Sequence, residues 1–176
     1  MNTIRYTTDL SEEDFVSSLQ SEVTHHDEFR LISYLSPGGV VVRGISPPEN
    51  CETKFFGIIN EQKFSIVENT EKQFVSPYQP ILYGKVEGGK ITISPQMHPQ
   101  AYPLLWLYTS FGGLLILLGI VISLEDSFIF ALSLFFGIIL IVFPRYRTKI
   151  HFEACLKTAL ISFENLPIDI EKINHN

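Results

Sequence analysis

Lysine and arginine are scarce in this sequence and are absent from one long stretch of it. They make up 13 of the 176 residues, and none lies between Lys90 and Arg145. A bilayer penalises each basic residue at the centre of a helix by about 2.5 to 3.5 kcal/mol. A long stretch without such residues is therefore typical of a segment that lies in a membrane.

Cysteine is also scarce, because the chain contains only Cys51 and Cys155. Two cysteines so far apart in sequence predict free thiols in a reducing compartment rather than a disulfide. The first residues, MNTIRYTTDL, contain no apolar run of the kind that a cleavable signal peptide needs. We therefore expect the N-terminal part of the chain to lie in the cytoplasm.

Most motifs that carry chemistry are missing. The sequence has no Walker-type loop, no Gly-x-Ser-x-Gly elbow, no His-Glu-x-x-His and no Cys-x-x-Cys. His25-His26-Asp27 is a compact cluster of possible metal ligands, but histidines at the end of a helix more often contact its last carbonyls. We therefore predict a protein that is not an enzyme, with no catalytic residue, no cofactor and no metal site.

Acidic residues outnumber basic ones in the N-terminal part of the chain. Residues 1–101 hold 8 Lys or Arg and 13 Asp or Glu, which gives a net charge of −5. A phosphate backbone would be repelled by this charge, so the composition argues against nucleic acid as a partner.

The stretch without basic residues contains two uncharged apolar segments, Leu104–Ser123 and Ser127–Phe143. As helices, each would be about 25 to 30 Å long, which is close to the thickness of the hydrocarbon core of a bilayer. Only residues 124–126 separate them, so we predict an antiparallel transmembrane hairpin in which Asp126 caps the second helix. A hairpin buried in a soluble core is disfavoured, because both segments are apolar on all sides.

The charges beside the hairpin predict its orientation. Arg145, Arg147 and Lys149 follow the second segment, whereas the turn carries Glu125 and Asp126 and no base. The positive-inside rule therefore places both termini in the cytoplasm, and the three basic residues are predicted to contact lipid headgroups.

Small residues recur along the two apolar segments at intervals that let helices approach closely. One interpretation is that they pack the hairpin on itself, and the other is that one face docks on another membrane protein. The segments contain no Asp, Glu, Lys, Arg or His, so we do not expect this chain alone to transport ions. The predicted packing residues are Thr109, Gly112, Gly113, Gly119, Ser133 and Gly137.

The soluble part begins with an extended stretch at Ile4–Tyr6 and a capping sequence at Ser11–Asp14. Apolar residues at helical spacing predict one amphipathic helix after it. Apolar runs separated by turn residues then predict three hairpins. The six predicted strands are Leu31–Leu35, Val40–Ile45, Phe55–Ile59, Lys63–Val67, Ile81–Val86 and Lys90–Ile93.

Two of these hairpins look like copies of one another. Residues 56–66 align without gaps on residues 83–93, and an aromatic-Gly pair opens each copy. Gly57 and Gly84 lie within predicted strands, where glycine indicates a bulge, a bend or a close approach of another group. A groove for a ligand is an alternative, but the architecture of the sheet explains the same residues more simply.

The fold class that these patterns predict is an α+β membrane protein with an antiparallel meandering sheet, flanking helices and a two-helix transmembrane hairpin. We divide the chain into a β-rich cytoplasmic domain at 1–101, the hairpin at 102–144 and a cytoplasmic helix with a tail at 145–176. In this last part, apolar residues recur at helical spacing from Phe152 to Phe163, until Pro167 stops the helix. We expect this stripe to pack on the sheet, the alternatives being the membrane or a partner.

One set of residues lies in and after the repeated hairpins, just before the two apolar segments: Phe56, Gly57, Ile58, Phe64, Ile66, Pro80, Gly84, Val86, Ile91, Ile93, His98 and Pro99. In these residues the chain resembles a group of small uncharacterised bacterial membrane proteins, over residues 54 to 145. This resemblance implies the architecture above and a bacterial inner or internal membrane, and it implies no activity. A more distant resemblance, in the order of elements only, is to pleckstrin-homology-like domains fused to a membrane hairpin.

The function that we predict is that of a non-catalytic accessory or assembly subunit, held in membrane lipids beside another integral membrane protein or a second copy of itself. A lipid- or ligand-sensing module is the first alternative. An enzyme acting on a membrane substrate is the second, and it would need a pocket that holds His98 or the His25–Asp27 cluster. His98 and Pro99 form the candidate functional turn into the membrane.

Overall fold

The computed structural model describes most of the chain, and its residues form two compact units. One unit contains residues 1–98 and 154–176, and the other contains residues 99–153. The predicted turns at 124–126 and at His98-Pro99 lie outside the described residues, as does Asp27. The described residues are 3–26, 33–36, 39–42, 51–70, 78–97, 101–122 and 127–173.

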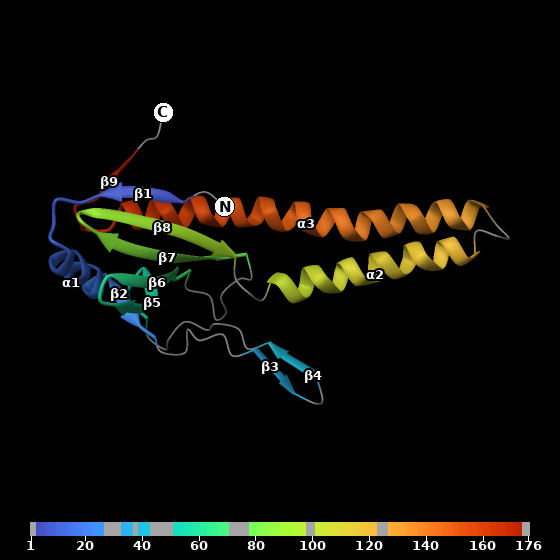
Figure 1. Ribbon diagram of the computed structural model, residues 1–176, viewed down its shortest axis with the longest axis horizontal. Coiled ribbons are helices and arrows are strands. Elements are labelled where there is room, and N and C mark those ends of the chain that lie inside the picture. The colour runs from blue at the N-terminus through green and yellow to red at the C-terminus, as the bar shows by residue number, and fades with distance from the viewer. Residues whose placement is uncertain are drawn as a thin grey trace. The chain divides into compact units, whose positions relative to one another are not determined.

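The first unit is built on a seven-stranded sheet with the strand order β2-β5-β6-β7-β8-β1-β9 (Figure 1). A separate two-stranded sheet pairs β3 (Ser33–Ser36) with β4 (Gly39–Val42). The strands of the large sheet are β1 (Ile4–Thr7), β2 (Val23–His25), β5 (Phe55–Asn60), β6 (Lys63–Glu68), β7 (Pro80–Glu87), β8 (Lys90–Met97) and β9 (Glu171–Lys172).

The large sheet is mixed, which differs from the antiparallel sheet that we expected. Strands β5 to β8 pair with their neighbours antiparallel, but β2 pairs parallel with β5. The cause is the helix α1 (Glu12–Glu22), which carries the chain from β1, near one edge of the sheet, to β2 at the other edge. A strand that arrives after such a crossover can run parallel to its new neighbour.

The repeated sequence forms equivalent hairpins. In the first copy Gly57 pairs with Ile66, and in the second copy the aligned residues Gly84 and Ile93 pair in the same way. Each hairpin turns through two residues, because Asn60 pairs with Lys63 and Glu87 pairs with Lys90. The alignment in the sequence therefore corresponds to a repeated structural unit.

Two helical segments cover the apolar face of this sheet. Phe15 and Leu19 of α1 are buried, and so are Ala159 and Phe163 near the end of α3 (Ser127–Glu164). The ring of Phe163 stacks on Phe64 of β6 with 6.0 Å between the ring centroids. The prediction that the C-terminal apolar stripe packs on the sheet is therefore confirmed.

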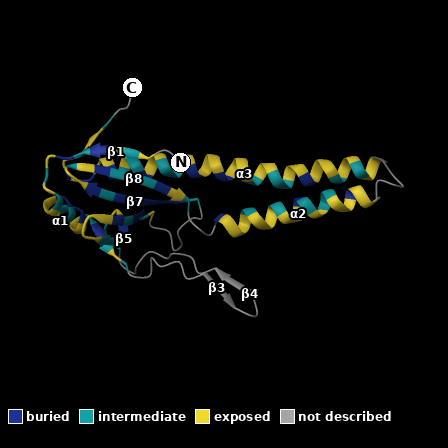
Figure 2. Ribbon diagram, in the orientation of Figure 1, coloured by how far each residue is buried: buried dark blue, intermediate teal, exposed yellow. Residues whose placement is uncertain are grey.

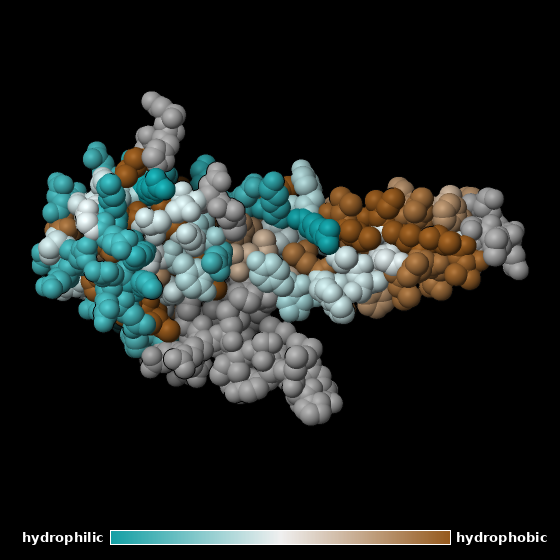
Figure 3. All heavy atoms as spheres, viewed as in Figure 1, coloured by the Kyte–Doolittle hydropathy of each residue, from teal (hydrophilic) through white to brown (hydrophobic). Residues whose placement is uncertain are grey.

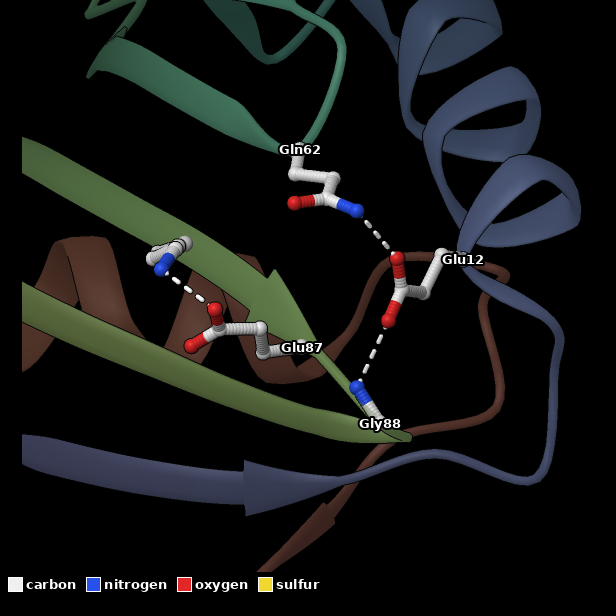
Figure 4. A network of polar contacts seen from close by, with 5 residues as sticks. Glu12, Gln62, Glu87 and Gly88 are labelled. Carbon is white, nitrogen blue, oxygen red and sulfur yellow. Dashed lines mark hydrogen bonds and ion pairs between the residues drawn. The ribbon is translucent and has the colours of Figure 1, made fainter.

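One carboxylate ties the start of α1 to the turns of both hairpin copies (Figure 4). Glu12 accepts a hydrogen bond of 2.7 Å from the backbone N–H of Gly88 and one of 2.5 Å from the side-chain amide of Gln62. Ser11 caps the helix, and its hydroxyl accepts a hydrogen bond from the N–H of Asp14, as the capping sequence predicts. These contacts fix the N-terminal end of α1 beside the turn end of the sheet.

The second unit contains α2 (Ala101–Ile122) and residues 127–153 of α3. Both helices are long and apolar enough to cross a membrane. Only 11% of the most apolar 18-residue stretch of α2, and 6% of that of α3, is buried (Figure 2). We expected a second apolar helix near 127–143 and a further helix after it, whereas α3 is one helix of 38 residues with Pro144 inside it. Proline removes one backbone donor, and here the helix continues on both sides of it.

Candidate functional site

The two glycines Gly112 and Gly137 form a close approach between α2 and α3. A Cβ atom on Gly112 would lie 2.7 Å from the carbonyl oxygen of Gly137, and one on Gly137 would lie 2.8 Å from that of Gly112. Side chains of Ile141 and Ile116 would be crowded in the same way. Glycine is therefore required at both positions for the helix backbones to pack at this distance.

A second contact between the helices lies nearer the hairpin turn. A Cβ atom on Gly119 would lie 2.7 Å from the Cβ atom of Ser133. At the other end of the hairpin, Arg145 donates a hydrogen bond of 3.2 Å to the hydroxyl of Thr109, which itself donates to the carbonyl of Leu105. Small and polar residues thus link α2 to α3 at three levels.

Gly113 behaves differently from the other small residues. A Cβ atom at this position would meet nothing within 4 Å, although the neighbouring Gly112 has no room for one. Of the six predicted packing residues, Gly113 is therefore the one that the hairpin does not need for its own packing.

Large apolar side chains cover the outward faces of both helices (Figure 3). Trp106 is 71% exposed, Val121 is 70% exposed and Phe128 is 73% exposed. Tyr108 and Tyr146 are exposed as well. Monomeric proteins in water rarely leave such a continuous apolar surface uncovered, so this surface requires a covering phase or partner.

The basic residues that follow the apolar part of α3 are exposed. Arg147 donates from Nε to the ring Nε2 of His151, and Lys149 lies 3.9 Å from Glu153. Arg145 is the member of the group that contacts α2. Their predicted role at lipid headgroups stays a prediction.

A second group of basic residues lies on the face of the large sheet opposite α1 and the end of α3, and it was missed from the sequence. Arg5 of β1 pairs with Thr92 of β8, Thr92 pairs with Lys85 of β7, and Lys85 pairs with Lys63 of β6. Residues paired across antiparallel strands point to the same face of a sheet, so these side chains form a row. With Lys90 they make up a surface that we call the basic face.

A shallow hollow of about 220 Å³ lies on the basic face. Arg5, Lys85 and Lys90 line it together with Thr92. Glu87 also lines it and forms an ion pair of 2.6 Å with Lys85. The basic side chains thus converge on one spot although they come from three strands.

Two tyrosines in the first unit have raised pKa values. Burial raises the pKa of Tyr6 far above its ordinary value of 10.0, and a hydrogen bond of 3.0 Å to Glu164 raises it further. Burial alone raises the pKa of Tyr83. Both phenols therefore stay protonated at physiological pH, and Tyr6 ties β1 to the end of α3.

The predicted metal and thiol candidates show no assembled site among the described residues. The ring of His26 lies edge-on to Phe56 at 5.8 Å, and His25 is exposed. No group of three or more metal-binding side chains occurs in the part of the chain that the structure describes. Cys51 and Cys155 are not joined in a disulfide, as predicted.

Comparison with known proteins does not place the chain in a family. No protein-family model matches it, and no curated protein or solved structure is similar enough to count as a match. The function must therefore be argued from the geometry of the chain itself.

Proposed function

We propose that this protein is an integral membrane protein and a non-catalytic accessory subunit of a larger membrane assembly. The helices α2 and α3 form its transmembrane hairpin, and the sheet domain works at the cytoplasmic side. The single observation that supports the membrane location is the large apolar surface exposed on both helices. A bilayer would cover this surface at no cost, since no charged side chain lies within residues 104–122 or 128–143.

The orientation follows from the exposed basic residues Arg145, Arg147 and Lys149. The positive-inside rule places them, and with them both termini, in the cytoplasm. In keeping with the resemblance noted in the sequence, we propose a bacterial inner or internal membrane as the location.

The accessory role is supported by the contrast between two adjacent glycines. The hairpin uses Gly112 in its own packing, whereas Gly113 faces open space. A glycine on the outer side of a membrane helix lets a helix of another protein approach closely. The partner that fits this position is another integral membrane protein or a second copy of this chain.

Copurification with a matched pair of variants tests this role. The tagged protein is released from its native membrane in mild detergent, sized by chromatography, and analysed by mass spectrometry. For the unchanged protein, we expect a stoichiometric companion protein or a dimer. The Gly113→Leu variant should lose this companion or second copy, while its helical circular dichroism stays unchanged. A protein that elutes alone, or a Gly113→Leu variant that keeps its companion, would reject the role.

A lipid- or ligand-sensing module is the second candidate function, and the basic face is the observation that favours it. Four basic side chains on one face of a sheet attract anions. A lone protein that retains a defined anionic lipid through purification would favour this candidate over the accessory role.

A further inference from the structure

The basic face concentrates positive charge on a chain that is acidic overall. The whole chain has a net charge of −6. Among the described residues before α2, the basic residues are Arg5, Lys54, Lys63, Lys85 and Lys90, and all but Lys54 belong to this face. The acids that share the face in the paired strands are Glu87 of β7 and Glu171 of β9, so its charge remains positive. Such separation of charge attracts an anionic partner.

The basic side chains are available for binding. Arg5, Lys63 and Lys90 are exposed, and the side chain of Lys85 is 43% exposed. Their neighbours in the same strands, such as Tyr6 and Val86, point to the opposite face and are fully buried in the core. The alternation of the strands therefore holds the charges on a rigid platform.

The arrangement of the charges is a row rather than a compact cluster. Arg5, Lys85 and Lys63 lie on β1, β7 and β6, with Thr92 of β8 between the first two. Because neighbouring strands are about 4.8 Å apart, the row is about 14 Å long. A single phosphate group could contact only part of it, whereas an extended peptide of about five residues matches its length. The hollow is also smaller than the cavities of about 300 to 1,000 Å³ that hold small molecules.

We propose that the basic face is the surface through which the sheet domain binds an acidic segment of a partner protein. Carboxylates of the segment pair with Arg5, Lys63 and Lys85 along the row, and one of them enters the hollow beside Thr92 and Lys90. This inference rests on the proposed accessory role, because it gives that role a contact on the soluble side. It does not depend on which protein contacts the membrane helices.

Binding of a labelled polyglutamate peptide to the purified full-length protein in uncharged detergent tests the proposal. Fluorescence anisotropy at low and high salt measures the affinity. The test variant combines Arg5→Gln, Lys63→Gln and Lys85→Gln. The control variant combines Lys54→Gln, Lys157→Gln and Lys172→Gln, which removes three basic residues from exposed positions outside the basic face.

We expect the peptide to bind the unchanged protein with an affinity that falls with salt, and the test variant to bind about tenfold or more weakly. The control variant should bind as the unchanged protein does. The proposal would be overturned if both variants lost the same affinity for the peptide, or if the peptide did not bind the unchanged protein. So would a preference for inorganic phosphate or anionic lipid vesicles over the peptide. The copurification of a membrane companion is a separate readout, so the accessory role can fail or hold independently.

Discussion

The ring of Phe64 lies against the backbone of Gly84 on the neighbouring strand. A Cβ atom on Gly84 would lie 1.9 Å from Cζ of this ring, so no side chain fits there unless the ring moves. Phe64 also stacks on Phe163 of α3, and through this pair the strand glycine determines how closely the end of α3 packs on the sheet. The sequence leaves a bulge, a bend or a close approach open at Gly84, and the structure has the close approach, with Phe64 as the group that approaches.

Substitution of Gly84 tests this contact. We expect Gly84→Val to lower the free energy of unfolding of the sheet domain by about 3 kcal/mol, because the core around Phe64 is already filled. Chemical denaturation followed by circular dichroism measures the loss. Gly84→Ala combined with Phe64→Leu should lose less than the sum of the two single losses, because the smaller side chain makes room. Simple additivity would contradict the account.

The phenol of Tyr6 predicts a loss of stability at alkaline pH. Its folded pKa is raised above the ordinary value of 10.0, so the stability it contributes is complete below pH 10 and is lost as the pH rises further. Tyr6→Phe should cost about 1 kcal/mol at neutral pH through the hydrogen bond to Glu164, and should weaken the alkaline loss. Denaturation curves at neutral and alkaline pH measure both effects.

Tyr83→Phe serves as the comparison for Tyr6→Phe. Burial alone raises its pKa, so this variant should weaken the alkaline loss with little change at neutral pH. If neither variant alters the loss of stability at alkaline pH, other titrating groups cause that loss.

The link between Glu12 and the two hairpin turns predicts a specific effect on stability. Glu12→Ala leaves the N–H of Gly88 and the amide of Gln62 without their acceptor, and we expect a loss of about 1 to 2 kcal/mol. Glu13→Ala, at the next exposed position of the same helix turn, is the matched control and should change stability by less than about 0.5 kcal/mol. Equal losses of stability in the two variants would mean that the negative charge at the start of α1 matters and that the two hydrogen bonds of Glu12 do not.

The packing of the hairpin can be tested at two neighbouring positions. Gly112→Leu would force α2 away from Gly137. Gly113→Leu would instead place its side chain in open space. In detergent, we expect the first variant to lose helical signal at a lower temperature and the second to melt as the unchanged protein does. Identical melting of the two variants would contradict the packing described for this hairpin.

Local patterns in the sequence predicted the elements whose neighbours are close in the chain. The capping sequence at Ser11 predicted the start of α1, the turn residues between apolar runs predicted the hairpins, and the uncharged runs predicted the two long helices. The parallel pairing of β2 could not be predicted, because it depends on where α1 delivers a three-residue strand. The basic face could not be predicted either, since Arg5, Lys63 and Lys85 meet only through the register of four strands.

The location of the hairpin in a membrane is the central claim, and cysteine labelling tests it most directly. Asp126→Cys is introduced between the two helices in a chain whose Cys51 and Cys155 are replaced by serine, and intact cells are treated with an impermeant thiol reagent. We predict labelling from outside the cell, because the proposed topology places residue 126 on the far side of the membrane and both termini in the cytoplasm. Labelling that occurs only after lysis, with release of the protein from membranes by alkaline carbonate, would contradict the account.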